Sequence, residues 1–387
     1  MLDDPNARRI LPLADVQVVS FAEQYPGPIC ARLLADLGAR VIQVERPLVG
    51  DAARTANPWL FRTTAMLRES VVLNLKDPHA LAAARALVDR SHVLLEGYRP
   101  GVLDRIGLGY SDVSRSNPRI VYCSITGFGQ DGPYSEQIGH NINYEAVAGL
   151  LDPYISELGL DTYFHGGLPV GDVLSGCIAA VALVSYVRHA ERTGQGKKLD
   201  LSITDSLAFA IAPNVTRSIN GEDAWSEREA GYATYRTADG FIALGIAHEQ
   251  EFWVSLCALL NLPELAELTH AERTTSKREL APLIESRLIA HTTTEWLALL
   301  RGVVPCSPVN ALDDLTEDPQ LVHRGLFATA MDERGRQFKT LLSPLAQGAG
   351  VDERPMRVES LGESTARVLA ELGLSEAEIE FLNAASG

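Results

Sequence analysis

The chain has 387 residues, with 34 basic and 50 acidic side chains and a formal net charge of −16. Nucleic acid and anionic lipid both require a basic face, so this balance argues against either partner. No apolar run approaches the ~20 residues of a membrane span, and the start of the chain lacks the apolar core of a signal peptide. The five cysteines are spread widely without a CxxC pair. We therefore expect no disulfide framework, no metal site and a cytoplasmic location.

The first part of the chain predicts an α/β fold. Short apolar runs typical of buried strands alternate with helical patterns, which makes successive βαβ units and implies a parallel sheet. Such a doubly wound domain binds ligands beyond the carboxyl ends of its strands. The predicted strands lie at 16–22, 40–46, 70–75, 92–98 and 119–126.

After residue 150 the pattern changes. Residues 170–194 predict one long apolar helix, and its small residues Ser175 and Gly176 indicate close packing. Two apolar runs around Asp239-Gly240 predict a hairpin. From these patterns we expect a large domain over 1–214 that residues 326–387 complete, a polar linker at 215–227 and a smaller α+β domain over 228–325.

Three motifs have competing interpretations. GFGQDG (127–132) fits G-x-G-x-x-G, but Pro133 follows it and no helical pattern begins, so a dinucleotide site is disfavoured. Asp172, just before the long apolar helix, is either an N-cap or a catalytic carboxylate. His140, in a polar stretch, is either structural or catalytic. The residues alone leave both alternatives open.

Several segments, in order from about residue 12 to residue 330, resemble one known family. It is the class III CoA-transferase family, or CaiB/BaiF group, which includes the formyl-CoA transferases and the α-methylacyl-CoA racemases. The matching segments are LADLGARVIQVERP (34–47) with Gly50-Asp51, VLNLKDP (72–78), LLEGYRPGVLDRIGLGY (94–110), GFGQDGPY (127–134), VGDVLSG (170–176), TGQGKKLDLSITDS (193–206), YRTADG (235–240) and VPCSPVNALDDLTEDPQLVHRG (304–325).

The resemblance implies a Rossmann-like large domain and a homodimer in which two chains interlock. It also implies coenzyme A or acyl-CoA as a substrate, with no tightly bound cofactor, and a carboxylic acid as the second substrate. An acidic chain must meet the CoA phosphates with a few well-placed cations. By resemblance, the CoA-contacting residues are Gln24, Tyr25, Arg46, Leu73, Lys76, Gly97, Tyr98, Arg105 and Ile106.

The resemblance further implies that Asp172 is the catalytic carboxylate. In the transferases this aspartate attacks the acyl-CoA and becomes a covalent aspartyl intermediate. In the racemases it shares acid–base chemistry with a histidine that matches His140. GHNINY resembles the racemase pattern, whereas Asn141 replaces a racemase aspartate and the racemase glycine run after the catalytic aspartate is missing. We favour CoA transfer.

Racemisation and an inactive CoA-binding protein are the alternatives to CoA transfer. The acyl donor and acceptor cannot be identified from the sequence, and neither can a supporting role of Glu249 for His140.

Overall fold

The computed structural model describes residues 11–152, 167–222, 229–346 and 356–384. The chain forms two compact units, one made of residues 1–215 with 322–387 and the other of residues 216–321. Each unit has a hydrophobic core of its own.

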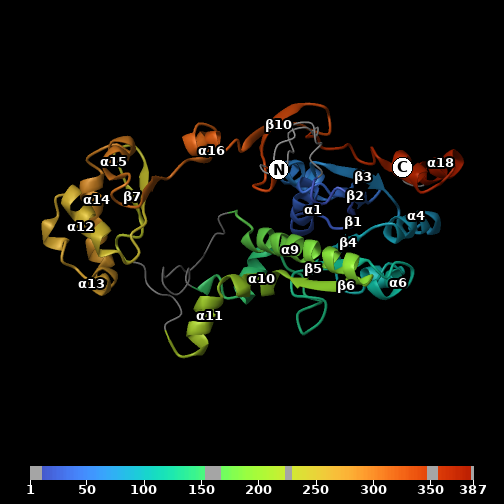
Figure 1. Ribbon diagram of the computed structural model, residues 1–387, viewed down its shortest axis with the longest axis horizontal. Helices are drawn as coiled ribbons and strands as arrows, with labels where there is room; N and C mark the ends of the chain where they lie inside the picture. Colours follow the sequence, from blue (N-terminus) through green and yellow to red (C-terminus); the bar gives the residue numbers. More distant parts are fainter. Residues whose placement is uncertain (1–10, 153–166, 223–228, 347–355, 385–387) are drawn as a thin grey trace. The chain divides into compact units, whose positions relative to one another are not determined.

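The larger unit is built on a six-stranded parallel sheet (Figure 1). Its strand order is β3-β2-β1-β4-β5-β6. β2 and β3 therefore lie on one side of β1, and β4, β5 and β6 lie on the other side. Loops at the carboxyl ends of β1 and β4 therefore diverge and leave a crevice where ligands bind in open sheets. The predicted α/β class with a parallel sheet is confirmed. The strands are β1 (Gln17–Ser20), β2 (Arg40–Glu45), β3 (Arg68–Val72), β4 (Val93–Glu96), β5 (Val121–Thr126) and β6 (Lys197–Ser202).

Helices pack on both faces of this sheet. Because successive strand residues point to opposite faces, Val18 of β1 lies in a core with α1, α9 and α10, and Val19 lies in a core with α4, α17 and α18. Figure 1 shows the C-terminal helix α18 on the side of α4, where Phe381 contacts His79 edge-on. These helices are α1 (Pro26–Asp36), α4 (Pro78–Asp89), α9 (Val170–Thr193), α10 (Ile203–Ala210), α17 (Thr365–Glu371) and α18 (Glu376–Ala384).

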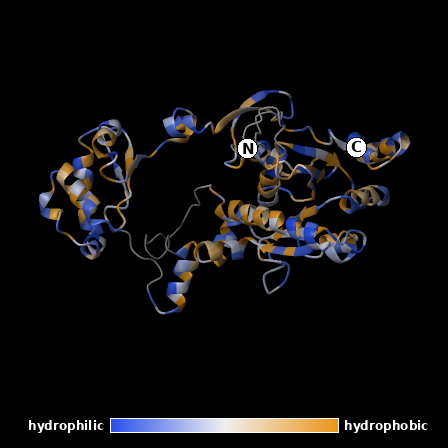
Figure 2. Ribbon diagram, viewed as in Figure 1, coloured by the Kyte–Doolittle hydropathy of each residue, from blue (hydrophilic) through white to orange (hydrophobic). Residues whose placement is uncertain are grey.

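Helix α9 is apolar along most of its length (Figure 2). By length and composition it could cross a membrane, so the prediction that no segment reaches that length is wrong. Its buried alanine, valine and leucine side chains pack against α1, α10 and β5, although 39% of the apolar window is buried and Val181 is exposed. The small side chains allow close approach: Gly176 faces the carbonyl oxygen of Pro26 at the start of α1.

Shorter elements complete the larger unit. Residues 127–140, which contain the GFGQDG motif, form no helix, as expected. A two-stranded antiparallel hairpin, β10 paired with β11, precedes the C-terminal helices. These elements are α2 (Ala53–Ala56), α3 (Pro58–Ala65), α5 (Val102–Arg105), α6 (Tyr110–Ser116), α7 (Asn141–Val147), β10 (Phe327–Met331) and β11 (Gln337–Leu341).

The smaller unit combines a three-stranded antiparallel sheet, of order β7-β8-β9, with a set of helices. The predicted hairpin at Asp239-Gly240 is confirmed, since it joins β7 to β8. Trp253 and Trp296 are buried in the core between sheet and helices. Its elements are β7 (Thr234–Arg236), β8 (Phe241–Leu244), α12 (Gln250–Leu259), η1 (Pro263–Leu265), α13 (His270–Thr275), α14 (Lys277–Leu288), α15 (Thr293–Leu300), β9 (Cys306–Pro308) and η2 (Leu312–Thr316).

Two helices cross the boundaries between the units. α11 (Ala212–Ile219) occupies the start of the predicted 215–227 linker, and the boundary between the two units lies within it, after Val215. The polar composition of this segment fits α11, which buries none of its residues. The second helix is α16 (Pro319–His323).

Replacing Gly176 with alanine should destabilise the larger unit. An added Cβ would lie 2.6 Å from the Pro26 carbonyl oxygen, so α1 and α9 would have to separate. Overpacking costs ~1–3 kcal/mol, against a gain of up to ~1 kcal/mol in helix propensity, and we expect a net loss of about 1–2 kcal/mol in urea unfolding. Val181→Ala is the control, because Val181 is 69% exposed on the same helix. A Gly176→Ala protein as stable as the unmodified chain contradicts close packing at this position.

Candidate active site

A cavity of about 350 Å³ opens where the sheet topology reverses. The turns that follow β1, β4 and β5 form part of its wall, together with the segment before α7 and the first turn of α9. This is the position that the strand order predicts for a ligand site. The lining residues with a bearing on chemistry or on ligand contact are Glu23, Gln24, Tyr25, Gly97, Tyr98, His140, Asn141, Tyr144 and Asp172.

Asp172 lies in the first turn of α9, two residues after the helix begins. The N-cap is Pro169, so the interpretation of Asp172 as a capping residue is wrong. Burial raises the pKa of the Asp172 carboxyl to about 6; the His140 charge lowers it and the Glu145 charge raises it. Among the described residues, no hydrogen-bond donor contacts the Asp172 carboxylate. The carboxylate therefore faces the cavity without a protein donor among those residues, an arrangement that suits a nucleophile or a base.

Asn141 performs the capping that Asp172 does not. Its side-chain oxygen accepts hydrogen bonds from the backbone N–H groups of Gly171 (3.0 Å) and Asp172 (3.2 Å). A side chain at position 171 would crowd this oxygen, because a Cβ there would lie 3.0 Å from it. The glycine before the aspartate thus lets the amide of Asn141 approach the start of α9. A residue on α7 thereby holds the backbone of Asp172 in place.

Glu145 fixes the orientation of the Asn141 amide. It lies one helical turn further along α7, is buried, and accepts a 2.6 Å hydrogen bond from the Asn141 side-chain nitrogen. With the nitrogen directed to Glu145, the oxygen must face the N-terminus of α9. Glu145 is not among the residues predicted from the sequence, although its i,i+4 spacing from Asn141 was a readable signal.

His140 lines the same cavity as Asp172. It occupies the N-cap position of α7, and its backbone N–H donates to the side-chain oxygen of Asn143 at 2.9 Å. The ring is not buried, and its charge favours the ionised form of Asp172. The two residues that the resemblance implicates in catalysis, 32 positions apart in sequence, therefore face one cavity.

Two tyrosines flank Asp172. Burial raises the pKa of Tyr25 and of Tyr144, and the Asp172 charge adds to the rise in both. The Tyr144 hydroxyl donates to the carbonyl oxygen of Gly139 at 2.5 Å. Glycine is needed at position 127, since a Cβ there would lie 2.2 Å from the Tyr144 ring. The segment between β5 and α7 is thus held against the aromatic wall of the cavity.

Four of the predicted CoA-contacting residues line the cavity: Gln24, Tyr25, Gly97 and Tyr98. Gln24 has a left-handed backbone with φ of 67°, a conformation that costs a non-glycine residue ~1–2 kcal/mol. Beneath Tyr98, Glu96 is buried and accepts the Tyr98 N–H at 2.8 Å, and burial raises the pKa of Glu96 to about 7.

The other five predicted CoA contacts lie outside the cavity lining. Arg46 follows β2 and reaches the lining indirectly, through a 2.9 Å ion pair with Glu23. Lys76 and Arg105 are exposed, in the turn before α4 and at the end of α5. Leu73 is buried in the core, where its N–H donates to the carbonyl oxygen of Glu45, and Ile106 packs against the same core.

Glu249 belongs to the smaller unit, where its carboxylate accepts the backbone N–H groups of Ala247 and His248. These bonds lower its pKa. Across the described residues, no group of three or more histidine, cysteine or acidic side chains is placed to hold a metal ion.

Comparison with known proteins shows which family the chain belongs to. The sequence profile of CoA-transferase family III matches residues 13–359. The chain belongs to CoA-transferase family III. Its relatives include the mouse succinyl-CoA:glutarate CoA-transferase, 31% identical over 333 residues that cover 81% of this chain and 76% of the mouse protein. A crystal structure of a CaiB/BaiF family protein from Brucella suis is 27% identical, with a TM-score of 0.78 over 93% of this chain and 99% of that one.

Family membership does not by itself choose between transfer and racemisation. The human α-methylacyl-CoA racemase is also 31% identical, over 380 residues that cover 96% of each protein. The chain is equally identical to a transferase and to a racemase, so only the residues of the site can distinguish CoA transfer from racemisation.

Replacing Asp172 with asparagine should stabilise the protein at neutral pH and above. Because the folded-state pKa is raised to about 6 from an ordinary 3.8, the folded state binds this proton more tightly than the unfolded state. Stability from this group is full below about pH 4 and is lost as pH rises through about 6. A neutral amide removes that loss, and we expect a gain of about 1–3 kcal/mol for Asp172→Asn at pH 8 that disappears near pH 4.

Thermal unfolding at a series of pH values measures this gain. Asp205→Asn is the matched control, because Asp205 also lies in the first turn of a helix, α10, but is exposed. A gain that is absent at pH 8, or equal at pH 4 and pH 8, contradicts the raised pKa.

Proposed function

We propose that the protein is a CoA-transferase that moves coenzyme A from an acyl-CoA thioester to a free carboxylic acid through a covalent intermediate on Asp172. One observation carries the proposal: a partly buried carboxylate, without a hydrogen-bond donor among the described residues, faces a cavity at the topological switch point, backed by the N-terminus of a long helix. A helix N-terminus favours negative charge, so it stabilises both the carboxylate and the oxyanions that form next to it.

The reaction divides into four acyl exchanges. In each one a negatively charged nucleophile attacks and a negatively charged leaving group departs, so the net charge does not change. The Asp172 carboxylate attacks the thioester carbonyl, the C–S bond breaks, and a mixed anhydride and CoA thiolate form. The thiolate attacks the aspartyl carbonyl, which releases the first acid and leaves an aspartyl-CoA thioester. The carboxylate of the second acid then attacks that thioester and forms a new anhydride and thiolate. Attack of the thiolate on the new acyl carbon gives the product thioester and restores Asp172.

The chain's own residues have separate tasks in this scheme. Asn141, held by Glu145, fixes the backbone of Asp172. Gln24 and the turn around Gly97 lie across the cavity, where the thioester end of CoA would bind. Succinyl-CoA with glutarate is the first pair to assay, since the mouse relative carries that name.

Racemisation of a 2-methylacyl-CoA is the second candidate. The observation that favours it is the shared cavity of His140 and Asp172, two groups that could exchange a proton with opposite faces of one α-carbon. Asn141 argues against this candidate, because it replaces an aspartate of the racemases. In this chain an aspartate at position 141 would face the buried Glu145, and two carboxylates in hydrogen-bond contact cannot both ionise.

An interlocked homodimer and a cytoplasmic location belong to the same proposal. α11 supports association, because it buries none of its residues and leaves Ile219 76% exposed.

One isotope experiment separates the candidates. The protein is incubated in D₂O with a 2-methylacyl-CoA, and separately with succinyl-CoA and glutarate, while mass spectrometry follows α-deuterium and CoA exchange. We expect CoA exchange without α-deuteration, and a loss of more than about 100-fold in Asp172→Ala. Hydroxylamine added during turnover should modify a peptide that contains Asp172.

Two variants complete this test. Asp205→Ala, which changes an exposed first-turn acid of α10, should keep full activity. His140→Ala should slow a racemase ~10²–10⁴-fold and a transferase less. Faster deuterium exchange than CoA exchange with every acid offered makes the protein a racemase. CoA binding with neither exchange identifies an inactive CoA-binding protein.

Affinity for CoA should depend on Arg46, Lys76 and Arg105. Each lies after a strand or turn of the larger unit, and in a chain of charge −16 these cations are the proposed partners of the diphosphate and 3′-phosphate. Charge-assisted contacts contribute about 1.5–3 kcal/mol each, so each alanine variant should weaken CoA binding about 10- to 100-fold in calorimetry.

Dephospho-CoA identifies the cation at the 3′-phosphate, because only that variant should bind CoA and dephospho-CoA with similar affinity. Arg115→Ala is the control, since the Arg115 side chain is 74% exposed on α6. Three variants with unchanged affinity contradict the placement.

A further inference from the structure

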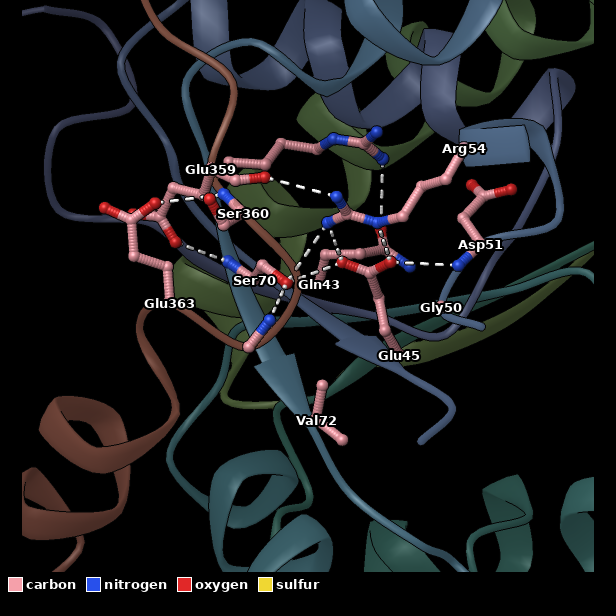
Figure 3. Close-up of polar contacts among 12 residues, drawn as sticks. Gln43, Glu45, Gly50, Asp51, Arg54, Ser70, Val72, Glu359, Ser360 and Glu363 are labelled. Carbon is pink, nitrogen blue, oxygen red and sulfur yellow. Dashed lines mark hydrogen bonds and ion pairs between the residues drawn. The ribbon is translucent and has the colours of Figure 1, made fainter. Parts of the chain in front are cut away.

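Figure 3 shows a network of polar contacts around Glu45, Arg54 and Ser70. Asp51 connects this network to the backbone of Gln24 by hydrogen bonds. Its centre is formed by two carboxylates, Glu45 at the end of β2 and Asp51 in the following turn, which are 3% and 1% exposed. Neither lines the cavity, and the proposed reaction uses neither. We call the chain of contacts Glu359–Ser70–Glu45–Asp51–Gln24 the carboxylate relay.

The first link of the relay holds the strained residue of the cavity wall. The Gln24 N–H donates to both carboxylate oxygens of Asp51, at 3.1 and 3.2 Å. Asp51 also accepts the N–H of Ala53 at 2.8 Å, which fixes its carboxylate at the start of α2. A left-handed glutamine persists only where its surroundings over-determine the conformation, and the Asp51 carboxylate supplies that constraint.

The second link holds Asp51 in place. Glu45 accepts the Asp51 N–H at 2.9 Å, and Arg54 binds both Glu45 oxygens at 2.7 Å. Burial raises the pKa of Glu45, but the bonds from Arg54, Ser70 and Asp51 outweigh it, so the pKa lies below its ordinary value. Gly50 leaves room for this approach, because a Cβ there would lie 2.6 Å from the Glu45 carboxylate. Glu45 is thus a fixed anion.

The third link reaches the C-terminal segment of the chain. The Ser70 hydroxyl donates to Glu45 at 2.6 Å and accepts the N–H of Gly362 at 2.8 Å. The Ser70 N–H donates to the Glu359 carboxylate at 2.8 Å, and the Arg54 guanidinium donates to the Glu359 carbonyl oxygen. Figure 3 shows this segment crossing the edge of the sheet at Ser70. Residues nearly 300 positions apart are joined by buried hydrogen bonds.

We propose that Asp51 and Glu45 are positioning residues for acyl-CoA, and that the segment Glu359–Gly362 controls the acyl-CoA site through them by fixing the backbone of Gln24. The inference rests on the proposed function in so far as the ligand is a CoA thioester. Every link is a direct hydrogen bond between groups that are buried or partly buried, so a change at one end moves the backbone at the other.

The test compares variants on and off the relay. Asp51→Asn weakens the link to Gln24, because it removes the negative charge and replaces one of the two oxygens that accept the Gln24 N–H with an amide nitrogen. Ser70→Ala breaks the relay at the bonds to Glu45 and Gly362, whereas Thr365→Val removes only the hydroxyl that accepts the Val72 N–H on the same strand edge. We expect Asp51→Asn to weaken CoA binding more than 10-fold and Ser70→Ala about 3- to 10-fold in calorimetry, with Thr365→Val within twofold. Thermal unfolding is recorded for all three, so that affinity is compared at known stability.

A double-mutant cycle isolates the backbone effect. Glycine adopts a left-handed conformation without strain, so Asp51→Asn should weaken CoA binding less in a Gln24→Gly protein than in the unmodified chain. Equal losses in the two backgrounds overturn the proposed constraint on Gln24.

Hydrogen exchange separates this inference from the proposed function. In the ligand-free protein, the peptide that contains Gln24 should lose protection in Asp51→Asn and Ser70→Ala and keep it in Thr365→Val. Unchanged protection in Ser70→Ala overturns the relay, whatever the activity. If the unmodified protein shows neither CoA binding nor CoA exchange, the proposed function fails. The proposed control of an acyl-CoA site then fails as well, even if hydrogen exchange at the Gln24 peptide changes in the relay variants as expected.

Discussion

The contact between α1 and α9 at Gly176 is the constraint on which the site depends. α1 begins at Pro26, directly after Gln24 and Tyr25, and α9 carries Asp172 in its first turn. Because the two helices meet backbone against backbone near these ends, their separation fixes the distance across the cavity. Two helix N-termini therefore face the same space, and both favour negative charge there.

The sequence predicted the parallel sheet because five of its strands are apolar runs with β-branched residues, such as VQVVSFA and RVIQVER. It also predicted that Asp172 and His140 are the candidate catalytic residues, although only through family resemblance. It could not place Asn141 at the N-terminus of α9, because that contact joins residues 30 positions apart whose spacing reveals nothing about distance. For the same reason Ser70 and Gly362 offer no local pattern that pairs them.

The sequence left a capping role open for Asp172 because aspartate before an apolar helix commonly caps it. The structure separates the two tasks. Asn141 satisfies the first backbone N–H groups of α9, and the Asp172 carboxylate meets no donor among the described residues. A side chain that satisfied those N–H groups itself would lose nucleophilicity, since its lone pairs would be occupied. The division of labour between two residues is what leaves a reactive group at the helix N-terminus.

The C-terminal segment also completes the edge of the sheet. β3 is an edge strand, and the N–H groups of Ser70 and Val72 are satisfied by the side chains of Glu359 and Thr365, 289 and 293 positions later. During synthesis these partners are made after all six strands of the sheet, so the edge at β3 stays open until the segment around residues 359–365 has been made. Open edges invite pairing with other chains. A chain that lacks the segment from Glu359 to Thr365 would thus be prone to aggregate through this edge.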